Sequence, residues 1–194
     1  WYRPPEYYAG SKWRETWALD GGGALMNQGI HTLDLLTWLL GKAGRIFAFA
    51  RTQVHSIETE DTLVACLEFQ NGALAAFEAT TAAYPGIPRR LYLSGSRGTA
   101  LIEHDRLTSL DLIEDKDAAG QSTRQPAQVA DRSLSESSPV VSNTAGHRAL
   151  IEDFINAVRE DRDPVCSGTE GRRSLVLAEA IYESARTGKA VKLD

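Results

Sequence analysis

The sequence has 194 residues, of which 42% are hydrophobic and 24% charged, and its formal net charge of −5 is spread without long runs. This is the composition of an ordinary soluble globular domain, and without a basic patch we expect no nucleic-acid partner. No apolar run reaches the roughly 18 residues of a membrane span and no signal peptide is visible, so we expect a cytoplasmic protein with no membrane partner.

The two cysteines, Cys66 and Cys166, belong to no CxxC motif or Cys/His cluster. We therefore expect neither a disulfide nor a metal site, and interpret both as free, buried thiols in a reducing compartment. The chain begins at Trp1, and its only methionine is Met26. We interpret it as a fragment whose N-terminal part is absent.

Residues 1–19 hold three of the four tryptophans and three of the six tyrosines, interrupted by proline and glycine. We expect an ordered loop that either packs its rings on the core or forms one wall of a ligand pocket. Residues 24–40 then predict a helix that ends at Gly41.

Strand-like alternation follows at 45–54 and 62–69, and the Asn-Gly pair inside 70–73 predicts a hairpin. The later expected elements are strands at 73–83, 89–95, 99–105 and 107–115, a long loop at 116–143, helices at 146–161 and 169–188, and a short strand at 190–193. Ser167 and Glu170 fit a capping box at the start of the last helix.

Consecutive strands with short connections predict an α+β fold with an open, mostly antiparallel sheet and helices packed on one face. The other face of such a sheet must be covered, so we expect a homo-oligomer formed through it.

A polar stripe runs along the 24–40 helix, because Asn27, His31 and Asp34 lie at i, i+4 and i+7. The remaining positions are mostly apolar, so we expect a buried helix whose stripe either makes internal hydrogen bonds or lines a wet cavity. His31 is then either a structural histidine with Asp34 as its partner, or a proton carrier. Asn27 can orient a sugar hydroxyl but cannot act as an acid or base.

Three glycines, 21–23, precede this helix. They form either a flexible turn or a close approach that leaves the helix amino end open to an anion or an oxygen-rich ligand. No GxGxxG follows a strand, so we expect no cofactor-binding residues in this chain. The other three histidines, His55, His104 and His147, lack the spacing of metal ligands. We interpret them as structural or surface residues and expect no metal site.

Four stretches of the sequence resemble the C-terminal domain of the Gfo/Idh/MocA oxidoreductases, the glucose–fructose oxidoreductase and inositol dehydrogenase type. They are "YY" at 7–8, "KWRETW" at 12–17, "DGGGALMNQGIHTLDLLTWLLG" at 20–41 and the tail at 147–191. The resemblance implies that residues 1–194 are a single substrate-binding and oligomerisation domain. It also implies an N-terminal Rossmann domain, missing upstream, that binds NAD or NADP and carries a catalytic lysine. We therefore expect no cofactor bound to this fragment, and an inactive fragment.

By this resemblance His31 matches the active-site histidine, which would accept the proton of a hydroxyl on a sugar, polyol or nucleotide-sugar. Asn27 stands where the inositol dehydrogenase pattern has aspartate, and "NQGIH" resembles the branch that oxidises nucleotide-linked or amino sugars. Asp34 matches a position near the histidine and is interpreted as structural support for the helix.

The other expected substrate-binding residues are Trp13, Arg14, Gly22 and Gly23. Trp13 and Arg14 match a stretch near the substrate entrance of the family, and Arg14 either meets a carboxylate or phosphate or is a surface arginine. The alternative function is a non-catalytic sugar-sensing or dimerisation module on the same scaffold. The loss of aspartate at position 27 favours this alternative, and the presence of His31 argues against it.

Overall fold

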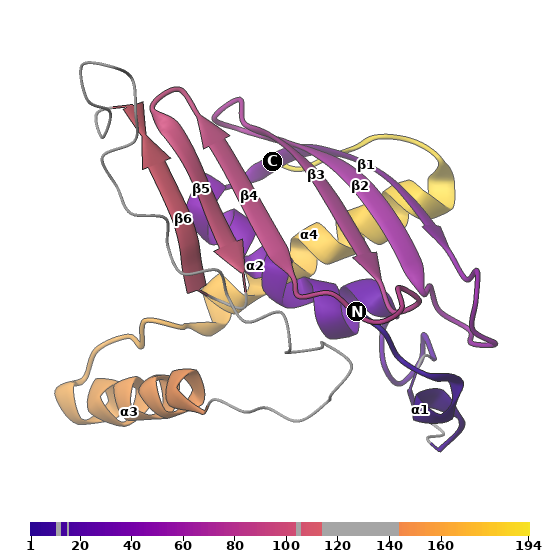
Figure 1. Ribbon diagram of the computed structural model, residues 1–194. Helices are drawn as coiled ribbons and strands as arrows, with labels where there is room; N and C mark the ends of the chain where they lie inside the picture. The colour runs from indigo at the N-terminus through magenta and orange to yellow at the C-terminus, as the bar shows by residue number, and fades with distance from the viewer. Residues whose placement is uncertain (11–12, 15, 104–105, 114–143) are drawn as a thin grey trace. The chain divides into compact units, whose positions relative to one another are not determined.

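The computed structural model describes residues 1–10, 13–14, 16–103, 106–113 and 144–194 (Figure 1). Contacts within the chain divide it into a larger unit, residues 3–82 with 138–194, and a smaller unit, residues 1–2 with 83–137. The described elements are α1 (Pro5–Ala9), a π-helical turn η1 (Leu25–Gly29), α2 (Ile30–Leu40), β1 (Ala43–Arg51), β2 (Thr62–Phe69), β3 (Leu74–Thr80), β4 (Arg90–Gly95), β5 (Gly98–Glu103), β6 (Arg106–Leu112), α3 (Ala145–Glu160), α4 (Gly168–Thr187) and β7 (Val191–Lys192).

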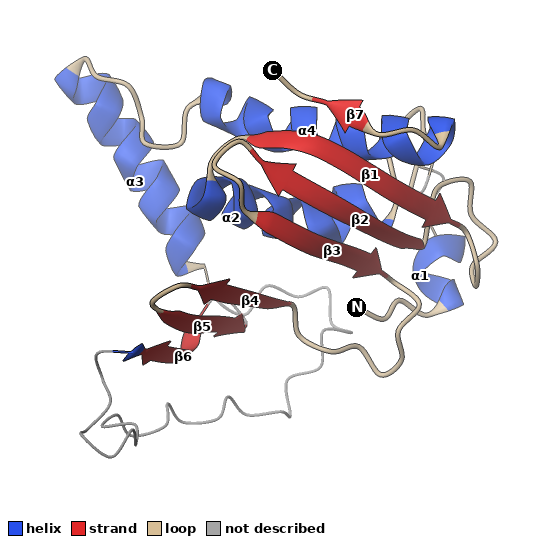
Figure 2. Ribbon diagram, turned by 90° about the horizontal axis from the view of Figure 1, so that it is seen from above, coloured by secondary structure: helices blue, strands red, loops and turns tan. Residues whose placement is uncertain are grey.

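The larger unit is built on a four-stranded sheet in the order β3-β2-β1-β7, with every pair antiparallel. The predicted hairpin joins β2 to β3, where Gly72 has a φ of 87° that favours glycine. Helices α2 and α4 lie together on one face of this sheet (Figure 2). The α+β class and the open antiparallel sheet are therefore confirmed.

Alternate residues of the strands face these helices and form the core. Ala48, Ala65 and Phe77 lie opposite one another in register, and all three are buried. The helices meet them with four buried side chains, Leu33 and Leu36 from α2 and Leu177 and Ile181 from α4. The burial of this apolar surface is the main stabilising contribution to the larger unit.

The opposite face of the same sheet is open and carries an exposed apolar patch beside the Arg45–Glu68 ion pair. Phe47 and Phe49 of β1 form an edge-to-face ring pair on it, and Phe49 is 56% exposed. Cys66 and Val64 of β2 lie opposite these two rings in register and are also exposed. The expectation of buried thiols was therefore wrong. Cys66 is on the side of β2 that faces away from the helices, and Cys166 is exposed just before α4.

The smaller unit contains the antiparallel sheet β4-β5-β6. Within the described residues the ladders thus form two sheets, not the single sheet that chain order suggested. The segment between β3 and β4 contains Pro85 and Pro88, which have no backbone N–H to donate to a ladder.

The C-terminal helices lie close to their predicted positions. Ser167 caps α4 by accepting a hydrogen bond from the Glu170 N–H at 3.3 Å, and Gly188 ends the helix with a φ of 66°. The apolar stripe of α3 is exposed, with Phe154 at 59% and Val158 at 68%. The loop predicted at 116–143 lies outside the described residues.

Residues 1–19 are not all loop as predicted, because Pro5 starts the short helix α1. Proline is well tolerated there, since the first helical N–H has no partner within the helix. Tyr8 of α1 donates a hydrogen bond to Thr81 at 2.8 Å and so holds the segment beside the end of β3.

Candidate functional site

The polar helix begins with a π-helical turn and continues without a break as α2 to Gly41, whose φ is 81°. Asn27 lies in the π turn, and His31 lies in the first turn of α2. Both are exposed, while Leu33 and Leu36 on the far side of the helix are buried. π turns are often found at functional sites. The sequence did not predict this turn, since its residues have ordinary helical character.

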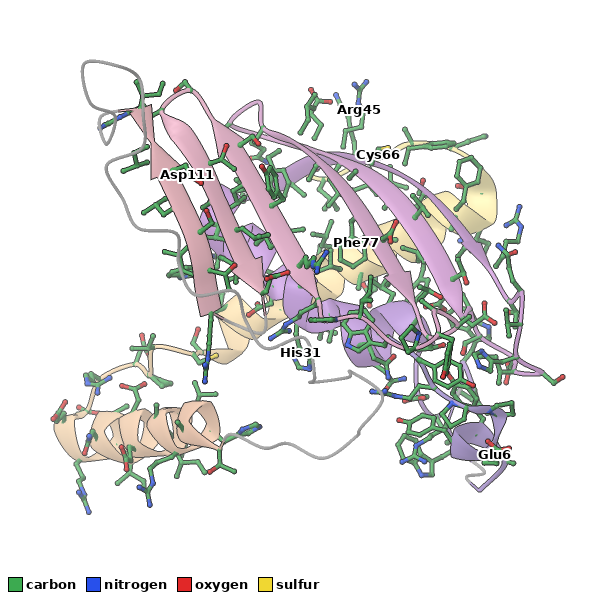
Figure 3. All side chains as sticks on the ribbon, in the orientation of Figure 1. Glu6, His31, Arg45, Cys66, Phe77 and Asp111 are labelled. Atoms are coloured by element: carbon green, nitrogen blue, oxygen red, sulfur yellow. The ribbon has the colours of Figure 1, made fainter. Side chains whose placement is uncertain are left out.

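The expectation of a fully buried helix was wrong, because only one side of α2 faces the core. Trp38, near its end, is 78% exposed. The polar stripe therefore borders open space. Figure 3 shows His31 projecting from α2 on the side away from Phe77 of β3. Within the described part of the chain, the imidazole of His31 makes no hydrogen bond or ion pair.

The two neighbours of His31 on the stripe do have partners. Asn27 donates from its side-chain amide to the carboxylate of Asp20 at 2.9 Å. Asp34 accepts a hydrogen bond of 2.6 Å from Ser174 of α4, which is buried. This hydrogen bond joins α2 to α4, and such a link is what a residue that supports the helix would make. The supporting role of Asp34 stays a prediction.

The amino end of the helix is occupied by a carboxyl group of the chain itself. Glu60, which precedes β2 and is 3% exposed, accepts hydrogen bonds from the N–H groups of Gly23 at 3.1 Å and Leu25 at 2.9 Å. Tyr182 of α4 donates its hydroxyl to the same carboxyl group at 2.9 Å. The helix end expected to bind an external anion is therefore not open, because Glu60 satisfies its donors.

Burial raises the pKa of Glu60 above its ordinary value, although the hydrogen bonds from Leu25, Tyr182 and Gly23 oppose the rise. Burial and the neighbouring Glu60 carboxyl also raise the pKa of Tyr182 far above its usual range. The Tyr182 hydroxyl thus stays protonated and acts as a donor.

Two of the three glycines are required by this arrangement. A Cβ on Gly23 would overlap the carbonyl oxygen of Glu60, and a Cβ on Gly22 would overlap the Tyr182 hydroxyl. Gly21 has a φ of 76° and open space around it. Close packing against Glu60 and Tyr182 thus explains why the chain has no side chains at 22 and 23.

The next residue, Asp61, is fully buried and holds a different loop. It accepts hydrogen bonds from the backbone N–H groups of residues 53–55 at 2.8 to 2.9 Å. It also pairs with the buried imidazole of His55 at 3.2 Å, in agreement with the structural interpretation of that histidine. Burial would raise the pKa of Asp61, but the hydrogen bonds from His55, Gln53, Val54 and Thr62 outweigh it and lower the pKa.

A small pocket lies beside the helix amino end. It is lined by Tyr7, Tyr8, Arg14, Asp20, Gly23, Ala24, Asn27, Gln28, Ile57, Glu60 and Thr81. The structure therefore brings together three of the predicted site residues: Arg14, Gly23 and Asn27. Gly22, Trp13 and His31 are not among the lining residues. Sequence reasoning missed Glu60, since an acidic pair before a strand resembles a solvated turn.

Arg14 is held by the aromatic segment. Its guanidinium lies over the Tyr7 ring at 4.3 Å and the Trp13 ring at 5.2 Å from their centroids. It also donates to the Tyr7 carbonyl oxygen at 3.2 Å. Stacking of this kind limits the motion of the side chain and leaves its charge at the pocket wall.

Residues 1–193 match the C-terminal alpha/beta domain of the Gfo/Idh/MocA oxidoreductase family. The chain therefore belongs to this family, whose fold agrees with the larger sheet and its helices. The myo-inositol 2-dehydrogenase of Thermotoga maritima is 24% identical over 180 residues, which are 89% of this chain and 50% of that protein.

Two solved structures extend the comparison. The WlbA dehydrogenase from Bordetella pertussis, in complex with NADH and UDP-GlcNAcA, is 32% identical with a TM-score of 0.79, over 100% of this chain and 52% of that one. The aldose-aldose oxidoreductase from Caulobacter crescentus, complexed with glycerol, is 27% identical with a TM-score of 0.70, over 94% and 51%. This chain thus spans about half the length of the relatives it matches.

The described residues were also compared with the requirements of a metal site and of a membrane-spanning helix. They contain no group of three or more histidine, cysteine, aspartate or glutamate side chains that could hold a metal ion. Their helices are also too short or too polar to cross a membrane.

Proposed function

We propose that this chain is the substrate-binding and oligomerisation domain of an NAD(P)-dependent dehydrogenase that oxidises a sugar hydroxyl, with His31 as the proton acceptor. The observation that carries the proposal is the exposed pair of Asn27 and His31, one turn apart on a helix whose other side is core. Its family membership supports the same reaction. The cofactor would be held by a part of the full-length protein outside residues 1–194.

Oxidation of a secondary alcohol removes a hydride from carbon and a proton from oxygen. A nicotinamide bound by the full-length protein would supply the acceptor for this hydride, which carries both electrons of the C–H bond. A neutral imidazole at His31 takes the hydroxyl proton as the C=O bond forms. The second nitrogen of the ring can pass the proton to water, since His31 is exposed.

The remaining predicted residues bind and orient the substrate. The amide of Asn27 is held by Asp20 and can direct its oxygen at a second sugar hydroxyl. Arg14 supplies a cation at the pocket wall for a phosphate or carboxylate, and Trp13, which is 50% exposed, offers a ring face to a sugar. Gly23 lines the same pocket.

A nucleotide-linked sugar is the substrate that these residues favour. Asn27 replaces the aspartate of the inositol dehydrogenase pattern, and the WlbA relative was solved with UDP-GlcNAcA. We expect the full-length protein to reduce NAD or NADP with a nucleotide-sugar at a kcat/KM at least about tenfold above that with free sugars or polyols. The absorbance of the reduced nicotinamide measures the rate. If nucleotide-sugars bind but no alcohol on the panel is oxidised with either cofactor, the sensing module is the better interpretation.

The open face of the larger sheet is the proposed contact between subunits. An exposed apolar patch extends across two neighbouring strands, with Phe47 and Phe49 on β1 and Val64 and Cys66 on β2. An apolar sheet face of this kind is costly in water, and an identical face on a second copy covers it symmetrically.

Phe49→Asp tests this contact. Because an unpaired carboxylate at an apolar interface loses its hydration without gaining a partner, we expect the dimer dissociation constant to rise at least about 30-fold. Sedimentation equilibrium of the full-length protein measures it. Val165→Asp, at a site 80% exposed between α3 and α4, is the matched control and should leave the assembly unchanged. Equal dissociation constants for the two variants would remove the sheet face from the interface.

A further inference from the structure

The amino end of the η1–α2 helix is anchored by one side chain that comes from a distant part of the sequence. The carboxyl group of Glu60 accepts hydrogen bonds from two backbone N–H groups, those of Gly23 and of Leu25, the first residue of η1. The carbonyl oxygen of Glu60 accepts a third, from Ala24 at 3.0 Å. Three consecutive N–H groups at the start of the helix are thus tied to a single residue.

A second tie runs from Glu60 to α4. Tyr182 donates to the Glu60 carboxyl, and its ring meets Trp17 edge to face with centroids 5.1 Å apart. Glu60 is therefore linked to the helix start, to the long core helix and, through Tyr182, to Trp17. It also lines the pocket that contains Asn27 and Arg14.

We propose that Glu60 is a positioning residue for the candidate site: its carboxylate fixes the π turn, and thereby aims Asn27 and His31 at the substrate. This inference rests on the proposed function, which assigns the site to His31 and Asn27. It also restricts the substrate, because a carboxylate already occupies the helix end and a substrate phosphate must instead meet Arg14.

The ionisation of Glu60 agrees with a positional role. Because its folded-state pKa is raised, the folded protein holds the proton of Glu60 more strongly than the unfolded chain does, and stability falls as pH rises through that range. The ionised carboxylate thus costs stability that its hydrogen bonds do not fully offset. The contribution of Glu60 lies in the geometry of the helix start, because a catalytic group displaced by about 1 Å can lower the rate of reaction about 100-fold.

Chemical rescue separates this geometry from the reaction. In Glu60→Ala a carboxyl-sized space remains opposite the N–H groups of Gly23 and Leu25, and formate can fill it. For residues 1–194 we expect formate, compared with chloride at equal ionic strength, to raise the Tm of Glu60→Ala saturably and to leave the wild type unchanged. It should also return the side-chain amide NMR signals of Asn27 toward their wild-type positions.

Asp153→Ala is the matched control. Asp153, in the middle of α3, also accepts a backbone N–H, from Val165 in the loop after that helix at 2.7 Å, but this hydrogen bond is exposed to solvent. Formate should give this variant no saturable shift. The same response in Asp153→Ala, or no specific response in Glu60→Ala, would overturn the role of Glu60 as the anchor, whatever the activity of the full-length protein.

Turnover of the full-length protein tests the consequence for the site. Glu60→Gln keeps the shape but turns a donor toward Gly23 or Leu25, so we expect kcat to fall about 10- to 100-fold with the KM for the cofactor unchanged. Formate should raise the turnover of Glu60→Ala at least about tenfold. Wild-type kcat in Glu60→Gln would overturn the proposal. A wild-type protein without turnover would overturn the proposed function, and the formate response would still decide the anchor.

Discussion

Replacement of His31 by alanine in the full-length protein is expected to lower kcat by about 100- to 10,000-fold while the fold stays intact. The reason is that the hydroxyl proton then has no positioned acceptor. His31 is exposed and makes no hydrogen bond within the described residues, so its loss should remove little packing and change the Tm little. Turnover at saturating substrate, together with circular dichroism and Tm, measures both effects.

His31→Gln and His147→Ala sharpen this experiment. Glutamine keeps a hydrogen-bonding group of similar reach but cannot take a proton near neutral pH, so it should lose nearly as much activity as alanine. His147 is an exposed histidine at the start of α3 and should be replaceable without loss. Turnover of His31→Ala within about threefold of the wild type would contradict the proton-acceptor role.

Gly23→Ala is expected to destabilise residues 1–194 by about 3 kcal/mol or more, because overpacking against a backbone atom cannot be relieved by a side-chain rotation. The added methyl group would overlap the Glu60 carbonyl oxygen, which also accepts the Ala24 N–H. The helix start or the segment before β2 must therefore move. Urea denaturation followed by circular dichroism gives the change in unfolding free energy.

Gly171→Ala is the matched control, since a Cβ at this position in the first turn of α4 meets nothing within 4 Å. Alanine is the better helix former, so this substitution should stabilise the chain by about 0.5–1 kcal/mol. The same glycine-to-alanine change should thus lower the unfolding free energy at position 23 and raise it at position 171. A Gly23→Ala variant as stable as the wild type would show that glycine is not needed there for packing.

Much of the fold could be predicted because local patterns decide it. The alternation at 62–69, the Asn71-Gly72 turn, and the cap and stop residues Ser167 and Gly188 each have a short-range physical cause, and the structure has the corresponding elements. The faces of these elements were harder to assign. The buried state expected for Cys66 failed because strand alternation says which residues share a face, but not which face the helices cover.

The sequence by itself determined the α+β class, the order of the strands and long helices, the family, and the polar stripe of Asn27, His31 and Asp34. Only the tertiary structure decided what meets the start of the helix that carries the stripe. Glu60 lies 37 residues from Gly23 and 122 from Tyr182 along the chain, so no sequence spacing relates them. A carboxyl group finds such partners through the packing of β3 and α4 against the helix, and local sequence patterns do not contain that long-range packing.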